Sequence, residues 1–143
     1  MKKIVFFILF GFIISGFVFS QSNEELAFEM FNRIHNNMQV WWQNNYSVVD
    51  DFSFSPRTNS NIQIISTVLS QQMRNNTVMF QNLANRKELT EEKIYSFYIE
   101  QYKLLNYLET TIGGNREANN MLVALAEEMR TMVMRACLFL IEQ

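Results

Sequence analysis

The C-terminal stretch "REANNMLVALAEEMRTMVMRACLFLIEQ", Arg116 to Gln143, decides the fold of this 143-residue chain. Its apolar residues return at alternating spacings of four and three, which is the period of one face of an α-helix. We expect a helix over residues 115–142, with Gly113 and Gly114 as the preceding turn and Asn115 as its N-cap. Its core seam is Ala118, Leu122, Leu125, Met129, Met132, Ala136 and Phe139. A seam of this length needs other helices to cover it, so the sequence predicts a helical bundle.

The same helix carries a second apolar stripe on its opposite side near the C-terminus. This stripe consists of Met134, Leu138 and Ile141. An apolar stripe outside the core seam predicts an interaction patch if the chain itself does not cover it. We therefore expect the C-terminal helix to bind a protein partner or a second copy of the chain through these residues.

Three further helices are expected over residues 22–44, 60–86 and 90–112, because apolar residues recur there with the same helical spacing. Ser22 and Glu25 fit a capping box at the start of the first helix, and Thr90 is placed to cap the third. Asn76 and Gln101 fall on apolar stripes, where we expect them to be hydrogen-bonded residues that set the helix register. The predicted fold class is all-α, an antiparallel four-helix bundle preceded by an N-terminal signal helix.

The connection over residues 45–59 is longer than the two to eight residues that usually join neighbouring helices. Its apolar residues Val48, Val49, Phe52 and Phe54 are expected to fold back onto the helices, with a short strand-like or helical turn before Pro56. A segment of this length can also run along the bundle. An up-down-up-down topology is therefore the first choice, and a crossover is the alternative.

The first twenty residues have the pattern of a secretory signal peptide. Lys2 and Lys3 precede an apolar run over residues 4–19, and polar sequence begins at Ser20. We expect cleavage after Ser20, which leaves a single domain over residues 21–143 in the periplasm or outside the cell. The alternative is an uncleaved anchor, although the run is shorter than the roughly 20 residues that span a bilayer. Membrane attachment is expected only through such an uncleaved segment.

The charge balance argues against nucleic acid as a partner. Removal of Lys2 and Lys3 leaves ten basic residues against fourteen acidic ones, a formal charge of −4. No cluster of Lys and Arg is dense enough to neutralise a run of phosphates. Cys137 is the only cysteine, so an intramolecular disulfide cannot form, and we expect an inert, partly buried thiol.

Catalytic and metal-binding signatures do not emerge from the sequence. His35 is the only histidine, which excludes sites built on two or more histidines. The acidic pairs Asp50-Asp51, Glu91-Glu92 and Glu127-Glu128 are adjacent rather than at metal-ligand spacing. Gly113-Gly114 fits a helix stop better than a phosphate-binding loop. We therefore expect no enzyme activity, no metal site and no cofactor.

The stretch "QVWWQNNY", Gln39 to Tyr46, places two tryptophans side by side. With about 100° per residue, both fit in one apolar arc of about 160° on the first helix. Trp42, His35 and Phe28 share one edge of this arc, and there we place the candidate site for a small apolar ligand. Non-covalent haem held by His35 and a methionine such as Met129 or Met132 is a special case of this alternative.

The start of the third helix, "LTEEK" (residues 89–93), resembles the LTxxQ signature of small exported helical chaperones, with Lys93 in the place of the glutamine. The likeness covers five residues and occurs once. It implies an ATP-independent holdase that shelters unfolded proteins. The sequence as a whole favours a non-catalytic, exported binding or envelope-associated adaptor bundle, with the holdase and the small-ligand or haem-binding bundle as alternatives.

Overall fold

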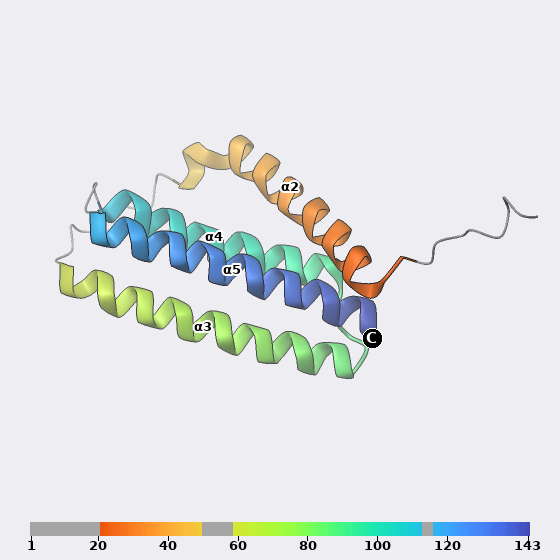
Figure 1. Ribbon diagram of the computed structural model, residues 1–143. Coiled ribbons are helices and arrows are strands. Elements are labelled where there is room, and N and C mark those ends of the chain that lie inside the picture. Colours follow the sequence, from red (N-terminus) through yellow and green to blue (C-terminus); the bar gives the residue numbers. More distant parts are fainter. Residues whose placement is uncertain (1–20, 50–58, 113–115) are drawn as a thin grey trace, which may run out of the picture.

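The computed structural model describes residues 21–49, 59–112 and 116–143 (Figure 1). The described residues form four α-helices and no strand. These are α2 (Asn23–Val49), α3 (Asn59–Asn85), α4 (Glu91–Ile112) and α5 (Arg116–Glu142). The prediction of an all-α chain with four helices is confirmed. Within the described ranges, no helix is long and apolar enough to cross a membrane.

Helix α5 occupies the centre of the arrangement. It packs against each of the other three helices, whereas the described parts of α2 and α3 make no contact with each other. Figure 1 shows the pair α4 and α5 in the middle, with α2 on one side and α3 on the other. The molecule therefore has two outer helices, each with one face turned to the shared pair.

The expected caps form at the starts of α2 and α4. The Ser22 backbone amide donates to Glu25 Oε2 at 3.0 Å, and the Glu25 amide donates to Ser22 Oγ at 3.2 Å. The Lys93 amide donates to Thr90 Oγ1 at 3.3 Å, and Glu91 and Glu92 lie in the first turn, where the helix dipole favours negative charge. The short-range prediction of these two helix starts is confirmed.

Helix α3 ends without a glycine. The Glu88 amide donates to the carbonyl of Leu83 and the Lys87 amide to that of Ala84, both at 2.8 Å, which is the hydrogen-bond pattern of a Schellman motif. Lys87 takes the left-handed position of this motif with φ of 58°. Because a Cβ atom is unfavourable there, this turn stores strain that a glycine would remove.

Helix α2 continues past the expected end at Asn44 and reaches Val49. The prediction that Val48 and Val49 belong to a loop is wrong, because the helix pattern extends through them without a proline or glycine to stop it. Several sequence predictions lie outside the described residues: the signal segment with its cleavage at Ser20, the contacts of Phe52 and Phe54, the turn before Pro56, the turn at Gly113-Gly114 and the N-cap at Asn115.

The core contains the predicted seam of α5 and also residues of α5 that lie beside the seam. Leu125, Met129, Met132 and Ala136 are buried, and Leu122 and Phe139 pack half-buried against them, while the side chain of Ala118 lies outside the described part. Val133 and Cys137, which lie beside the seam, are fully buried as well. This wider burial follows from the central place of α5, since a helix with three neighbours covers more than one stripe.

Two amide side chains are buried among these apolar residues, besides the hydroxyl of Ser66. Asn76 of α3 and Gln101 of α4 are nearly inaccessible to solvent, and Asn76 Nδ2 and Gln101 Oε1 have no hydrogen-bond partner. The prediction that these amides pair to set the register is wrong for these two atoms. Burial of an amide atom without a partner costs free energy, so both positions weaken the core.

Candidate functional site

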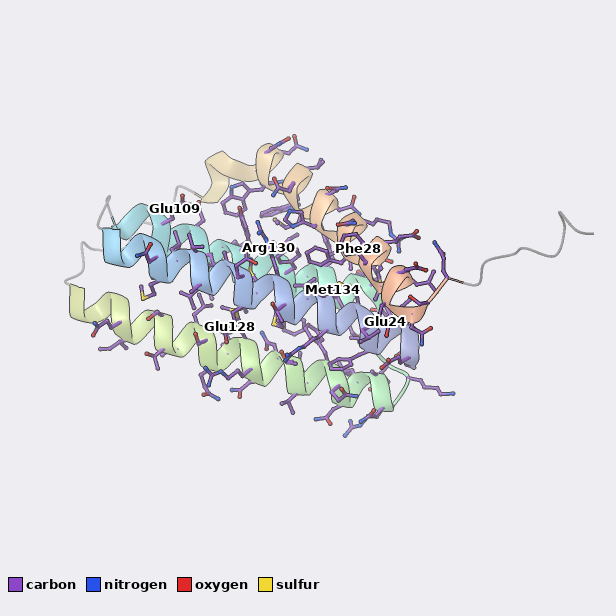
Figure 2. All side chains as sticks on the ribbon, in the orientation of Figure 1. Glu24, Phe28, Glu109, Glu128, Arg130 and Met134 are labelled. Atoms are coloured by element: carbon purple, nitrogen blue, oxygen red, sulfur yellow. The ribbon has the colours of Figure 1, made fainter. Side chains whose placement is uncertain are left out.

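His35 in α2 is contacted by side chains of α2 and α4 and lies within the electrostatic reach of α5. Its Nδ1 atom lies 2.6 Å from the hydroxyl of Tyr98 in α4, and its Nε2 atom lies 3.3 Å from the Gln39 side-chain amide one turn later in α2. The imidazole stacks between Phe31 and Tyr98, with ring centroids 5.7 and 5.9 Å away. The contribution of α5 is Arg130, which lies on the side of that helix that faces α2 (Figure 2).

The surroundings shift the pKa values of this cluster in ways that keep its groups neutral. Burial, helped by the positive charge of Arg130, lowers the pKa of His35. Burial raises the pKa of Tyr98 to about 12, against a smaller opposing effect of Arg130. Tyr102 also has a raised pKa, through burial and through the negative charge of Glu109. At neutral pH the cluster is therefore a neutral imidazole hydrogen-bonded to a neutral phenol.

The two tryptophans continue this aromatic surface along α2. Trp42 meets the edge of Tyr102 in α4, with ring centroids 4.9 Å apart and planes at 76°. Trp41 lies beside it, and Lys103 Nζ stands 5.3 Å from the centre of a Trp41 ring as a cation–π contact. Both indoles are half-buried, as their place within one apolar arc predicts.

The structure brings together some of the predicted ligand residues and separates another. His35 and Trp42 both face α4, through Tyr98 and Tyr102 respectively. Phe28 is more than half exposed, and Phe31 rather than Phe28 stacks on His35. Tyr98, Tyr102 and Arg130 also surround His35 and Trp42 and were not predicted as site residues. The four-residue spacing of the two tyrosines on α4 is the one sequence pattern that could have linked them.

The chemistry available to His35 is limited by its contacts. Both ring nitrogens already have a side-chain partner, so binding of haem iron would first have to break one of these contacts. The proposed second ligands, Met129 and Met132, are buried in the core. In the described ranges no group of three or more His, Cys, Asp or Glu side chains is arranged to hold a metal ion.

The predicted interaction stripe near the C-terminus is only partly accessible. Met134, Leu138 and Ile141 are half-buried and pack against the core. Figure 2 shows Met134 in the part of α5 where the start of α2, with Phe28 and Glu24, lies nearby. The chain itself therefore covers part of this stripe.

The outer face of α3 presents a second set of apolar residues, besides the stripe near the C-terminus. Ile64, Val68 and Val78 are 60%, 60% and 61% exposed. They lie within the arc of α3 that faces away from its core residues Leu69 and Phe80. Arg74 is the only charged residue of the whole helix, and it lies near the α5 side, with Nε 3.6 Å from Glu128 Oε1. The part of this side opposite the core residues is thus built from branched aliphatic residues and neutral amides, with the exposed Arg74 at its edge.

A groove of about 320 Å³ lies between α3 and α5, beside this face. Ser70 Oγ donates to Glu128 Oε2 at 3.1 Å across it, and Arg74 pairs with the same carboxylate. Figure 2 shows Glu128 in the space between the two helices. The carboxylate is therefore engaged by its own chain, and the groove offers no free charge to a ligand.

Comparison of the chain with protein-family models, with curated proteins and with solved structures gives no match.

Proposed function

We propose that this protein is an exported, non-catalytic four-helix bundle that acts by binding a protein partner. The observation that carries the proposal is the outer face of α3, where Ile64, Val68 and Val78 are about 60% exposed in a helix with a single charged residue. Depletion of charged residues is a feature that distinguishes the centre of a protein interface from the rest of a surface.

Export is supported by the N-terminal sequence. Lys2 and Lys3 followed by an apolar run of signal-peptide length favour secretion, with cleavage after Ser20. The mature protein then works in the periplasm or outside the cell. The N-terminal sequence of the protein recovered from the exported fraction tests this, and a chain that still begins at Met1 would contradict cleavage.

The arrangement of the bundle that we infer is antiparallel, with up-down-up-down topology. Contacts between α2 and α4 advance together along both helices, from Arg33 with Glu91 to Trp42 with Tyr102. The last residue of the chain reaches the beginning of α4, where Gln143 Nε2 donates to the carbonyl of Leu89 at 2.8 Å. These pairings support neighbours in sequence running in opposite directions. This leaves α3 at one side of the bundle.

Two observations support a role without catalysis. His35, the only histidine, is held neutral between an aromatic ring and a phenol rather than beside a nucleophile. Cys137 is fully buried, and burial raises the pKa of its thiol to about 12. A protonated, inaccessible thiol is a poor nucleophile at neutral pH.

Capture of partners from the native exported fraction tests the proposal. The double variant Val68→Glu/Val78→Glu should lose the proteins that the wild type retains, because the glutamates would be desolvated in the interface. Leu138→Glu examines the C-terminal stripe in the same experiment, and Val123→Glu on α5 is the matched exposed control. Equal capture by the wild type and the α3 variant would contradict the proposed use of α3.

A holdase is distinguished by its clients. A holdase should suppress the aggregation of several unrelated unfolded proteins at near-stoichiometric ratio, and the α3 variant should lose this effect. That result would favour a chaperone function over an adaptor function. An adaptor should leave such aggregation unchanged.

A second candidate function is binding of a small apolar ligand beside Trp42. The specific support is the half-buried aromatic surface of Trp41, Trp42 and Tyr102, since ligand sites are lined mainly by apolar and aromatic side chains. Addition of an apolar fluorescence quencher or a ligand library should then change tryptophan emission and raise the melting temperature. Emission and melting temperature that stay constant across the library would count against this site.

A further inference from the structure

The exposed face of α3 has the spacing of a coiled-coil seam. Its residues follow one another at intervals of four, three, four, three and four, and all lie within an arc of about 80° at roughly 100° per residue. The seam consists of Ile64, Val68, Gln71, Asn75, Val78 and Asn82, all solvent-exposed. Alternating spacings of this kind are those that the facing positions of two packed helices use. The core-facing residues of the same helix lie on its other side, so this seam has no partner within the described chain.

We propose that this seam binds the same seam of a second copy of the chain across a twofold axis. The inference rests on the proposed function and names the partner of the same face. A twofold interface uses one surface patch twice, so the patch must be complementary to itself.

The order of residues along the seam meets this requirement in both helix directions. With two α3 helices antiparallel, Val68 of one copy meets Val78 of the other and Gln71 meets Asn75 at the centre, while Ile64 meets Asn82 at the two ends. With the helices parallel, each of these residues meets its own equivalent. Either arrangement places aliphatic residues on aliphatic residues and amides on amides at the centre of the interface.

The amides also have unused hydrogen-bonding capacity. Gln71 Nε2 donates to Asn75 Oδ1 at 3.1 Å within the helix. This bond leaves the Gln71 carbonyl oxygen as an acceptor and the Asn75 amide group as a donor. In the antiparallel arrangement these two groups can pair between copies, which would satisfy both after water is excluded.

The charge pattern favours a second copy over a different partner. A partner of opposite charge would call for charged residues on the seam, and the seam has none. Arg74, the one charged side chain of the helix, lies beside the seam and pairs with Glu128 of its own chain. Two copies therefore approach each other without like charges meeting at the seam.

The size of the seam indicates a reversible dimer. The seam from Ile64 to Asn82 is about 27 Å long at 1.5 Å per residue, so one helix pair provides a small interface, below the standard size of stable complexes. We expect the mass in solution to rise from monomer to dimer with protein concentration.

Sedimentation equilibrium of the protein purified from the exported fraction tests the proposal. The wild type should approach twice the monomer mass at high concentration. Val68→Glu/Val78→Glu should remain monomeric, with dimerisation weakened by more than about a hundredfold. Val123→Glu, which changes a valine that is 63% exposed on α5, should dimerise like the wild type. All of these sites are largely exposed, so unchanged circular dichroism should accompany every variant.

Two further measurements separate the interface from a general effect on folding. An equimolar mixture of Val68→Glu/Val78→Glu with Val68→Lys/Val78→Lys should restore the dimer mass, because opposite charges then meet. Under mild oxidation, Val68→Cys alone should form a disulfide in a parallel dimer. In an antiparallel dimer, the disulfide should form only when Val68→Cys is mixed with Val78→Cys. The buried Cys137 does not compete.

A wild type that is monomeric at every concentration would overturn the inference. A dimer that survives the glutamate variant, or one that forms none of the engineered disulfides, would also overturn it by placing the interface elsewhere. If the wild type is monomeric but the glutamate variant loses a captured envelope protein, only the identity of the partner is wrong. If the wild type is monomeric and the glutamate variant captures the same envelope proteins as the wild type, the proposed function of the α3 face is wrong as well.

Discussion

The Nδ1 atom of His35 lies 2.6 Å from the hydroxyl of Tyr98, and this contact joins α2 to α4 across 63 residues of sequence. Tyr98 is fully buried, while the imidazole is half-buried and stacks on it. The hydrogen bond therefore sits at the boundary between the core and solvent. It gives the docking of α2 a polar, pH-sensitive element in addition to its apolar contacts.

Tyr98→Phe should lower the free energy of unfolding by about 1–2 kcal/mol, because it removes a buried hydroxyl and its hydrogen bond to His35. Urea denaturation followed by circular dichroism measures the change. Tyr95→Phe on the same helix is the matched control, since Tyr95 is half-buried, and it should change stability little. Equal effects of the two variants would show that the hydroxyl of Tyr98 contributes nothing specific.

The stability of the protein should fall as the pH drops from 7.5 toward 5. His35 has a folded-state pKa below its ordinary value of 6.5, through burial and through Arg130. The unfolded chain therefore takes up a proton at a higher pH than the folded chain does, so the contribution of neutral His35 is complete above 6.5. It is lost as the pH falls from 6.5 through the folded pKa.

Denaturation midpoints at several pH values measure this dependence. Facing His35 are Gln39 on α2, Tyr98 on α4 and Arg130 on α5. The pKa of Glu91 is lowered by its pairing with Arg33, so its contribution is lost only below its ordinary value of 4.5. His35→Gln should flatten the profile between pH 7.5 and 5. A variant profile as steep as that of the wild type would assign the effect to another group.

Gln101→Met should raise the free energy of unfolding by about 1–2 kcal/mol. The substitution keeps the length of the side chain and removes a buried carbonyl oxygen that has no hydrogen-bond partner. Gln72→Met on the exposed side of α3 is the control and should be nearly neutral. Destabilisation by Gln101→Met, measured by thermal unfolding, would mean that the amide has a partner in solution.

Lys87→Gly should stabilise the protein by up to about 1 kcal/mol, because glycine adopts a positive φ without steric cost. Lys87→Ala retains a Cβ atom and should give no such gain. Chemical denaturation of the two variants separates backbone strain from loss of the lysine charge. If alanine stabilises as much as glycine, the charge rather than the backbone is responsible.

Local interactions explain why most of the fold was predictable. Helical periodicity, the capping box at Ser22 and the cap at Thr90 involve residues within one or two turns of each other, and these predictions are confirmed. The end of α2 lies beyond its predicted position because the prediction treats residues 45–59 as one long connection, although no proline or glycine stands between Asn44 and Val49 to stop the helix.

The candidate site was only half predictable. The wheel of the first helix placed both tryptophans on one broad face, and both are half-buried. It could not identify Phe31 as the ring that stacks on the imidazole, nor Tyr98 as the hydroxyl partner. Those choices depend on side-chain rotamers and on the angle at which α2 crosses α4.

The sequence by itself determined that the chain forms four helices, where two of them begin, and that α3 has almost no charge. These properties follow from hydrogen bonds and side-chain periodicity within single segments. The tertiary structure alone decided that α5 lies at the centre, that Val133 and Cys137 are buried, and that the face of α3 with Val68 and Val78 stays exposed. The physical reason is that an apolar stripe shows only that burial of that helix face is favourable. Which helix covers it depends on how all four pack at once.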